Sequence, residues 1–492
     1  MKKIIQNPSL TYEGELLNFD NIFLDYPNPK CQRVPFILLN GRYRLEINKS
    51  SKIPSSFKEN VMVPYPLSSL LSGVKEAPKK NLHYHYHFNF EIVDNFMKDK
   101  VFINILRIDG SFTIFINGKK IYSGSDEIFL RKEIRDALDV GNNSLDIDFT
   151  KTGKYLGITG QIYLDTTDAS PIEHVKINTS LSDQSVTFQI ESNHPNGIIR
   201  IISPNGISKE YNFSSNKTTL YLDDIVEWNP INPFFYSYEI ITMTDKVKGL
   251  FSLINTSLGY EKNIPCLLLN NKPLSIKGIL DDYYYPDGVI TMPSFNHSSK
   301  MIKEIKKMGF NGIYIENRIE LPYFYYNLEI NGILSIVRID SYDIKNTIQK
   351  INYLSDYDIN ICFIIDNHIK TKTNEELYKI YKPYLDNKIL VVRSRFSKDY
   401  GDIKLIKNLN ELKRNKKNKC HKLLLSMEYK NDISVNYLNY LNEDYIKDSI
   451  SGLVGFYLSS LNNPKTGLFT PDFRKRNNGS KMIIEYEKNL NE

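Results

Sequence analysis

The first 170 residues carry short apolar runs that are separated by polar turn signals. The segment HYHYHFNF alternates strictly from His83 to Phe90, which is the period of a half-buried β-strand. Asn117-Gly118 lies between two strand-like runs, and this dipeptide is the strongest short-range signal for a hairpin. Many short strands with polar turns are typical of a sandwich, so we expect an N-terminal jelly roll over residues 1–170.

The next stretch, residues 171–262, continues as short strands. Its last apolar run, GLFSLINTSL at 249–258, is expected to form a single strand. Roughly seven strands in about 90 residues are typical of an immunoglobulin-like β-sandwich. The stretch lacks the Cys…Trp…Cys signature of antibody domains, so we expect a module without a disulfide.

After Lys262 apolar strands alternate with helical patterns. The strand candidates are LSIKGIL, NGIYIEN, LSIVRID, INICFIID, KILVVRS, DIKLIKN, KLLLSMEY and LVGFYLSS. This alternation is typical of a parallel sheet, and eight repeats match a (β/α)8 barrel over residues 263–492. The predicted fold class is therefore multidomain β plus α/β: a jelly-roll sandwich, an immunoglobulin-like sandwich and a C-terminal TIM barrel.

Composition and charge narrow the class of protein. The 492 residues suffice for about three domains. The 63 basic and 57 acidic residues give a net charge of +6 with both signs scattered, so no nucleic-acid partner is expected. Four cysteines without a CxxC pair predict neither a disulfide framework nor a zinc site. The N-terminus lacks the apolar core of a signal peptide and no apolar run reaches about 18 residues, so we expect a cytoplasmic protein without a membrane contact.

Three histidines share one face of the alternating strand. His83, His85 and His87 occupy every second position, so their side chains project to the same side. Such an array can bind a metal ion. No carboxylate or fourth ligand is adjacent in the sequence, and simple alternation in a solvated strand is therefore the favoured interpretation. No metal site and no cofactor are predicted.

In a (β/α)8 barrel the reactive groups come from the C-terminal ends of the strands. The strand ends give a polar rim that comprises Asp281 to Tyr285, Glu316-Asn317-Arg318, Asp340, Asp366-Asn367-His368, Arg393-Ser394-Arg395, Lys407-Asn408 and Glu428-Tyr429. Glu428 is favoured as a site residue because a lone carboxylate closes the apolar strand LLLSM. No phosphate loop, dinucleotide fingerprint, zincin motif or nucleophile elbow is present. A pair of carboxylates, as glycoside hydrolysis uses, is the natural candidate.

Six stretches in the same order as in glycoside hydrolase family 2 make the chain resemble that family, which contains β-galactosidases, β-glucuronidases and β-mannosidases. They are VPYPLSSLLSGV (63–74), DGSFTIFINGKKI (109–121) with IRDALDVGNNSLDI (134–147), GITGQIYLD (157–165), EWNPINPFFYSYEI (227–240), CLLLNNKPLSIKGILDDYYYPDG (266–288) and KKMGFNGIYIENRIELPYFYYNLEINGILSIVRID (306–340). The resemblance covers nearly the whole chain. It implies the three domains given above and the hydrolysis of β-linked glycosides with retention. It implies no cofactor and leaves a structural cation open, since members of the family sometimes carry one.

The resemblance also implies roles for single residues. The family's nucleophile is a Glu after the seventh strand, where LLSMEYKND has Glu428. Its acid/base is the Glu of an Asn-Glu pair that ends strand four, where INICFIIDNHI has Asn367 followed by His368. The family's Arg on strand two is Tyr314 here. The catalytic set is therefore Glu428, His368 and Asp366, and the substrate-binding set is Asn367 at the 2-hydroxyl, Tyr284, Tyr285, Asp287, Asp340 and Glu316.

The absence of the acid/base Glu leaves three routes for the proton. His368 can donate it if a neighbouring carboxylate such as Asp366 raises the pKa of the imidazole. A carboxyl group on another strand can reach the leaving oxygen instead, and the candidates are Glu316, Glu320 and Asp340. A substrate with a very good leaving group needs no acid at all. The alternative to an active enzyme is a catalytically silent homologue that binds carbohydrate or serves as a scaffold.

Overall fold

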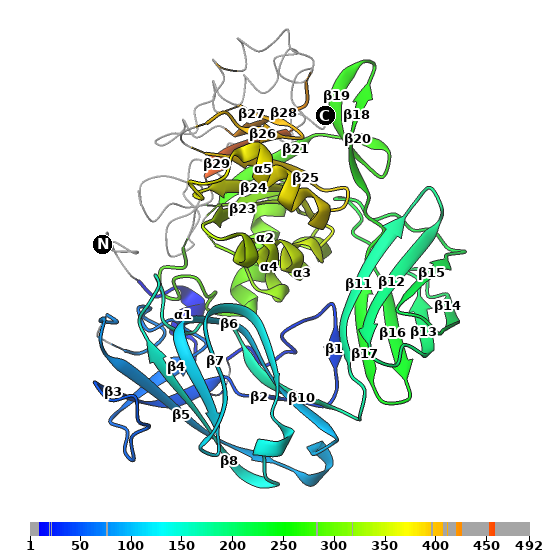
Figure 1. Ribbon diagram of the computed structural model, residues 1–492. Helices are drawn as coiled ribbons and strands as arrows, with labels where there is room; N and C mark the ends of the chain where they lie inside the picture. The colour runs from blue at the N-terminus through cyan, green and yellow to red at the C-terminus, as the bar shows by residue number, and fades with distance from the viewer. Residues whose placement is uncertain are drawn as a thin grey trace.

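The computed structural model describes residues 9–18, 20, 22–74, 77–281, 284–316, 318–394, 397–406, 411, 420–425 and 452–457. Within them the chain forms two β-rich bodies and a parallel sheet that is flanked by helices (Figure 1). The described part of the chain contains no helix with the length and apolar character that crossing a membrane requires.

The first β-rich body is an antiparallel sheet with the strand order β2-β10-β6-β8-β5-β3-β4, in which β7 and β9 also pair with β6. Its apolar side chains enclose a core that includes Tyr43, Tyr86 and Phe149. The predicted hairpin is confirmed, because Asn117 and Gly118 adopt φ values of 49° and 75° between β6 and β7. The strands are β2 (Phe36–Leu38), β3 (Gly41–Asn48), β4 (Glu59–Val63), β5 (His83–Ile92), β6 (Lys100–Ile116), β7 (Lys119–Glu133), β8 (Gly141–Thr150), β9 (Gly157–Ile158) and β10 (Ile162–Thr167).

The second β-rich body pairs two sheets, with strand orders β11-β12-β15 and β1-β17-β16-β13-β14. Phe188, Tyr238 and Phe251 pack edge to face or tilted in its core. β1 comes from the N-terminal segment and pairs with β17. The strands are β1 (Gln32–Arg33), β11 (Ile172–Ser180), β12 (Ser185–Ser192), β13 (Gly197–Ile202), β14 (Ser208–Phe213), β15 (Lys217–Tyr221), β16 (Tyr236–Thr242) and β17 (Lys246–Phe251).

The expectation of one strand over 249–258 is wrong. β17 ends at Phe251, and the chain bends before β18 (Thr256–Glu261) begins. The bend is held by Asn270, whose Oδ1 accepts a hydrogen bond from Asn255 N at 2.8 Å and whose N–H donates to Asn255 O at 2.7 Å. β18 then pairs with β19 (Ile264–Leu269) and β20 (Lys272–Leu274), so the boundary expected at 262–263 falls in the turn of this hairpin.

The C-terminal sheet has the order β26-β25-β24-β23-β22-β21-β29-β28-β27. All eight strand runs predicted after Lys262 are strands, and β29 pairs with β21 in parallel, so the sheet curls back on itself. Complete closure into a barrel stays a prediction. The strands are β21 (Ile276–Asp281), β22 (Gly312–Ile315), β23 (Leu334–Ser341), β24 (Asn360–Asn367), β25 (Ile389–Arg393), β26 (Tyr400–Gly401), β27 (Lys404–Ile406), β28 (Lys422–Leu425) and β29 (Gly452–Tyr457).

Helices connect the first five parallel strands, as the alternation predicts. Each begins with a residue suited to that place: Ser294, Asp343 and Thr373 accept hydrogen bonds from the first turns of α2, α4 and α5, and Pro322 starts α3. The helices are α1 (Tyr12–Glu15) near the N-terminus, α2 (Phe295–Lys307), α3 (Pro322–Ile330), α4 (Ile344–Ser355) and α5 (Asn374–Tyr381), with short 3₁₀ turns η1 (Asp94–Phe96), η2 (Arg135–Ala137) and η3 (Lys382–Tyr384).

Buried arginines join the three parts. Arg107 of β6 donates to the carbonyls of Ile290 and Ile319, each at 2.8 Å, and so ties the first sheet to the segments that follow β21 and β22. Arg33 of β1 contacts Asp165 of the first body at 3.3 Å and Asp245 of the second at 2.7 Å. The guanidinium of Arg107 is almost fully buried, so its hydrogen bonds hold the segments that follow β21 and β22 against the first sheet.

Candidate active site

Charged side chains lie at one level along the C-terminal edge of the parallel sheet. The register pairs Asp340 of β23 with Asp366 of β24, and Asp366 with Arg393 of β25. Arg338 precedes Asp340 by two positions on β23, so both side chains project to the same face. This edge is where a parallel α/β sheet carries its chemistry. We call the group the rim cluster, and its members are Glu316, Arg338, Asp340, Asp366, His368 and Arg393.

Asp366 lies between two guanidinium groups. Arg338 Nε donates to Asp366 Oδ2 at 2.7 Å, and Arg393 Nε donates to Asp366 Oδ1. The three side chains are only 17–19% exposed. Burial disfavours the charged carboxylate, but the hydrogen bond from Arg393 and the two positive charges outweigh it and lower the pKa of Asp366. Asp366 is therefore an ionised acceptor that holds two arginines in place.

His368 contacts Asp340 and not Asp366. His368 Nε2 donates to Asp340 Oδ1 at 3.0 Å, and Arg338 Nη2 donates to the same oxygen at 2.9 Å. The ring of Tyr342 stacks on the imidazole with centroids 4.4 Å apart. Asp340 and His368 are 43% and 33% exposed, so this pair is the open part of the rim cluster.

Glu316 has a different electrostatic environment from Asp366. Its carboxyl group is 17% exposed, and the guanidinium of Arg338 approaches Oε1 only to 3.8 Å, which is too long for a hydrogen bond. Burial raises the pKa of Glu316, and the charges of Arg338 and Arg393 offset only part of that effect. Glu316 therefore keeps its proton to a higher pH than an ordinary glutamic acid.

Tyr314 of β22 stands where the family resemblance leads one to expect an arginine. Its hydroxyl is buried and has no hydrogen-bond partner among the described residues. Burial raises the pKa of this phenol, and the nearby Arg393 offsets part of the effect. Tyr314 therefore leaves one buried polar group beside the rim cluster without a partner among the described residues, and such a group costs free energy.

Asn367 is engaged by the loop between β24 and α5. Its Nδ2 donates to Lys372 O at 2.9 Å and to Asn374 Oδ1 at 3.1 Å, while its Oδ1 accepts from Ile369 N at 2.8 Å. The amide therefore shapes this loop. Its contact with a sugar 2-hydroxyl stays a prediction.

Tyr284 and Tyr285 follow β21 and make different contacts. Tyr284 is 8% exposed, and Lys154, from the segment after β8, donates to its hydroxyl at 3.0 Å. Tyr285 is fully buried, and its hydroxyl donates to Glu320 Oε1 at 2.9 Å within a network that also holds Arg318. Of the two, Tyr284 is the one whose ring is bordered by the first β-rich body.

Asp287 is fully buried against the N-terminal segment. Its Oδ2 accepts from the amide and the hydroxyl of Thr11, at 2.8 and 2.6 Å. Burial raises the pKa of Asp287, and the bonds from Thr11 offset part of this effect. Thr11 also begins α1, so this carboxyl group anchors the N-terminal helix. A contact with sugar stays a prediction.

Several predicted rim residues lie outside the described residues. Glu428 is one of them, and β28 ends at Leu425, three positions before it along the chain. The role of Glu428 as a nucleophile stays a prediction. The others are Asp282, Tyr283, Asn317, Arg395, Lys407, Asn408 and Tyr429.

Arg338 is the member of the rim cluster that sequence reasoning missed. It stands inside the apolar run LSIVRID, two positions before Asp340. A cation within a buried strand needs a partner, so an arginine in such a run is itself a signal for a carboxylate on a neighbouring strand.

Comparisons with known proteins place the fold. No protein-family model matches the sequence, and no curated protein matches it. Solved structures do match: the β-glucuronidase of an uncultured Clostridium species is 13% identical, with a TM-score of 0.73 over 95% of this chain and 99% of that chain. The Ruminococcus gnavus β-glucuronidase in complex with D-glucuronic acid is 11% identical, with a TM-score of 0.75 over 94% and 99%. The Dictyoglomus thermophilum β-D-glucuronidase is 14% identical, with a TM-score of 0.70 over 94% and 98%.

These likenesses extend over nearly the full length of both chains, so the chain has the fold of these β-glucuronidases. The shared fold agrees with the order of the six segments that resemble glycoside hydrolase family 2. At identities of 11–14%, the likeness establishes the fold alone. Any chemistry has to be argued from the residues of this chain.

Proposed function

We propose that the chain is a glycoside hydrolase of family 2 type that cleaves the O-glycosidic bond of β-linked glycosides with retention. Support comes from the full-length fold likeness to β-glucuronidases and from the ordered segment resemblance. The rim cluster supplies one of the two carboxyl groups that this chemistry needs, and Glu428 supplies the other in this proposal. Residues 263–492 form the catalytic domain in this proposal, and β-glucuronides are the first substrates to test.

The observation that carries the proposal is the contrast between two carboxyl groups of the rim cluster. Asp366 is held ionised by two arginines, whereas burial raises the pKa of Glu316. A general acid needs a pKa above that of an ordinary carboxyl group, and burial shifts the pKa of Glu316 in that direction. Glu316 therefore donates the proton to the departing oxygen while the Glu428 carboxylate attacks the anomeric carbon. Glu316 then takes a proton from the water that hydrolyses the glycosyl-enzyme.

His368 is the competing proton donor. Its imidazole is partly exposed and bound to Asp340, which fits a proton shuttle at the open side of the cluster. The contacts of Asp366 argue against that residue as a donor, because a lowered pKa leaves it without a proton to give. Asp366 acts in this proposal as a positioning residue for Arg338 and Arg393.

The test compares leaving groups. Aryl β-glucuronides with very acidic phenols need little protonation of the leaving oxygen, whereas alkyl β-glucuronides need it fully. We expect Glu316→Gln to lower kcat/KM for the alkyl series by about 100-fold or more and to leave kcat/KM for the aryl series nearly unchanged, because acidic phenols need no acid in the first step. The kcat for the aryl series should fall, because hydrolysis of the glycosyl-enzyme loses its base. Glu428→Gln should lose cleavage of both series, because no covalent intermediate forms.

Two further variants make the test specific. His368→Gln should keep both activities, and selective loss of alkyl cleavage in that variant would move the acid role to His368. Glu375→Gln changes an exposed glutamate of α5 and should leave both rates unchanged. Wild-type rates in Glu428→Gln would contradict the proposed nucleophile.

The mutual neutralisation within the rim cluster favours a second candidate function. Arg338 and Arg393 are both bound to Asp366, so their charges are satisfied without a substrate. A homologue that binds carbohydrate without cleaving it fits this arrangement. The test is whether the wild-type chain hydrolyses β-glucuronides, β-galactosides, β-glucosides and β-mannosides. If it hydrolyses none of them but binds the same sugars measurably, this second function is established instead.

A further inference from the structure

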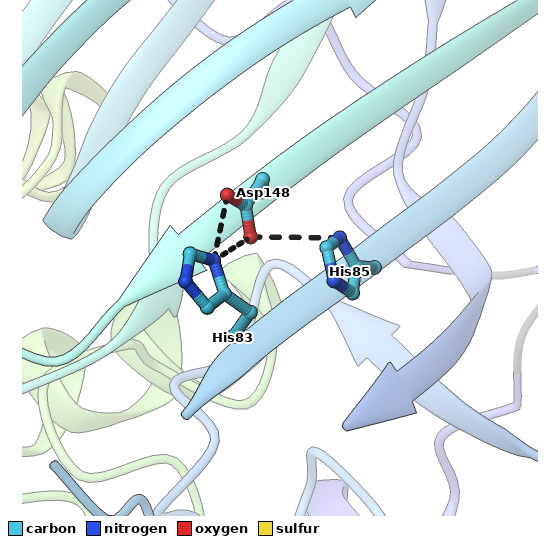
Figure 2. A group of neighbouring side chains, drawn as sticks. All are labelled: His83, His85 and Asp148. Atoms are coloured by element: carbon cyan, nitrogen blue, oxygen red, sulfur yellow. Dashed lines mark hydrogen bonds and ion pairs between the residues drawn. The ribbon is translucent and has the colours of Figure 1, made fainter. Parts of the chain in front are cut away.

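His83, His85 and Asp148 form a compact group in the first β-rich body, away from the rim cluster. The antiparallel register of β5 and β8 pairs His85 with Asp148 and His83 with Thr150. Figure 2 shows the Asp148 carboxylate on β8 between the two imidazole rings of β5. One nitrogen of each ring and one carboxylate oxygen all lie within 4.8 Å of one another.

This arrangement overturns the interpretation of a solvated strand at these histidines. His85 is only 1% exposed, and the carbonyl of Ser50, in the loop after β3, accepts a hydrogen bond from His85 Nε2 at 2.9 Å. The sequence showed no carboxylate beside the histidines because Asp148 is more than 60 residues away along the chain. Strand pairing brings it to them.

The hydrogen bond to Ser50 determines which nitrogen of His85 is available. A carbonyl oxygen only accepts, so Nε2 carries a proton, and in the neutral imidazole Nδ1 then carries a lone pair. That Nδ1 is buried and has no hydrogen-bond partner among the described residues. It faces Asp148 Oδ1 at 3.5 Å. In the neutral imidazole a lone pair and a carboxylate oxygen thus point at each other, and a metal ion between them makes this arrangement favourable. Their separation of 3.5 Å is longer than an ordinary hydrogen bond.

Within the described residues Asp148 makes no ion pair with a lysine or an arginine, and its ion-pair partners are the two histidines themselves. Glu46 lies opposite His85 on β3 and pairs with Lys58, whose Nζ is 3.6 Å from Oε1. The backbone carbonyl that fixes the tautomer of His85 is the kind of outer contact that orients metal-binding histidines.

The distances suit a zinc-like ion. Zn²⁺ binds imidazole nitrogen and carboxylate oxygen at about 2.0–2.2 Å, so two ligands in a tetrahedral site lie about 3.3 Å apart. His85 Nδ1 and Asp148 Oδ1 are separated by 3.5 Å. His83 Nδ1 now hydrogen-bonds both carboxylate oxygens at 2.9 Å, so it needs to open by only a few tenths of an ångström.

We propose that this group is a binding site for one divalent transition-metal ion, with Zn²⁺ as the best match, held by His83 Nδ1, His85 Nδ1 and a carboxylate oxygen of Asp148. On binding, the His83 proton resides on Nε2, so both rings present Nδ1. Three protein ligands leave a fourth position for water. The ion links β5 to β8, and through Ser50 it also links the loop after β3.

The site lies close to the part of the chain that reaches the parallel sheet. β8 ends at Thr150, two residues after Asp148, and the segment that follows carries Lys154 to the Tyr284 hydroxyl. A metal ion at Asp148 therefore fixes the end of β8, from which this segment starts. The readout of the site is stability and metal content, so the inference stands independently of the glycosidase proposal.

The test uses the full-length chain after treatment with a chelator. We expect it to take up one Zn²⁺ per chain, and Co²⁺ used as a probe should give visible absorption bands of a nitrogen and oxygen ligand set without a thiolate charge-transfer band. His85→Gln and Asp148→Asn should each weaken Zn²⁺ binding by about 100-fold or more, since even the loss of an outer contact costs 10–100-fold.

His87→Gln is the matched control. His87 lies on the same face of β5 but is bound to Asp146 at 2.7 Å, outside the group. This variant should bind Zn²⁺ like the wild type. Absence of uptake by the wild-type chain, a thiolate band in the Co²⁺ spectrum, or unchanged affinity in both His85→Gln and Asp148→Asn would each overturn the proposal. If one variant fails to fold, the wild-type spectrum and the other variant still decide.

Discussion

Two groups of aspartate and histidine side chains in this chain are similar in composition, but the pKa of the central aspartate is lowered in one group and raised in the other. Asp340, Asp366 and His368 lie at the edge of the parallel sheet, and His83, His85 and Asp148 lie in the first β-rich body. In both groups the ligand-type atoms are close enough together for a metal ion.

The two groups differ in whether arginine side chains bind the carboxylate. Two guanidinium groups already neutralise Asp366 and lower its pKa, whereas burial raises the pKa of Asp148, and the hydrogen bond from His83 does not compensate. Two guanidinium groups that bind both oxygens of a carboxylate disfavour a metal ion there, because they compete for the same lone pairs and add positive charge. Proximity of ligand atoms therefore does not suffice to identify a metal site.

The largest effect on stability is expected at the neutralised group. Asp366→Asn keeps the shape of the side chain but removes the carboxylate that Arg338 and Arg393 share, so that Arg338 keeps Asp340 as its close counter-charge and Arg393 loses its ion-pair partner among the described residues. We expect the free energy of unfolding to fall by about 3 kcal/mol, at the lower end for a broken buried ion pair because the groups are partly exposed. Urea unfolding measures it. Asp340→Asn, at a 43% exposed position, should cost about 1 kcal/mol or less, and equal losses would contradict this account.

Zinc should separate the two groups directly. At a concentration about 100 times its dissociation constant, Zn²⁺ should raise the free energy of unfolding by about 2.7 kcal/mol. The gain should persist in Asp340→Asn and disappear in Asp148→Asn. Thermal unfolding with Zn²⁺ and with a chelator makes the comparison. Loss of the gain in Asp340→Asn would place the metal at the edge of the parallel sheet.

Glu13 of α1 is a third carboxylate that basic side chains contact, here His297 and Lys300. The hydrogen bond from His297, helped by Lys300 at 2.6 Å, lowers the pKa of Glu13 to about 2 from 4.5. This stabilisation is present above pH 4.5 and is lost as the pH falls toward 2. Glu13→Gln should cost about 1–2 kcal/mol at neutral pH, after allowance for solvent screening.

The pH series provides the check on Glu13. Urea unfolding of Glu13→Gln and the wild type should give free energies that converge as the pH is lowered below 4.5. A difference that stays constant over this range would mean that the carboxylate charge is not what stabilises α1.

The smallest effect is expected at Tyr314. Removal of a buried hydroxyl that has no partner relieves a desolvation cost, so Tyr314→Phe should leave the free energy of unfolding unchanged or raise it by up to about 1 kcal/mol. Urea unfolding at neutral pH measures the change. A clear loss of stability would show that the hydroxyl has a partner outside the described residues.

Local patterns predicted most of the elements. Strict alternation placed β5, and the dipeptide Asn117-Gly118 placed the hairpin between β6 and β7, because both signals act within a few residues. The single strand expected over 249–258 failed for the complementary reason. Its bend depends on Asn270, which lies in the turn between β19 and β20, beyond the reach of the pattern at 249–258.

The site was predicted less completely than the fold. Reading the strand ends located Asp340, Asp366 and Arg393 at one edge, since parallel strands end together. The same reasoning named Asp366 as the carboxylate beside His368, whereas in the structure His368 is hydrogen-bonded to Asp340. Which neighbour a side chain selects depends on register and rotamer, and neither is encoded in the order of the strands.

The sequence by itself determined the strand and helix rhythm, the hairpin and the polar edge of the sheet, because each rests on spacing along the chain. The tertiary structure decided which charges meet. Asp148 reaches the histidines only through the pairing of β5 with β8, and Glu316 has its raised pKa only because the fold buries it. Electrostatic interactions depend on distance and burial in space, and residues far apart in sequence supply both.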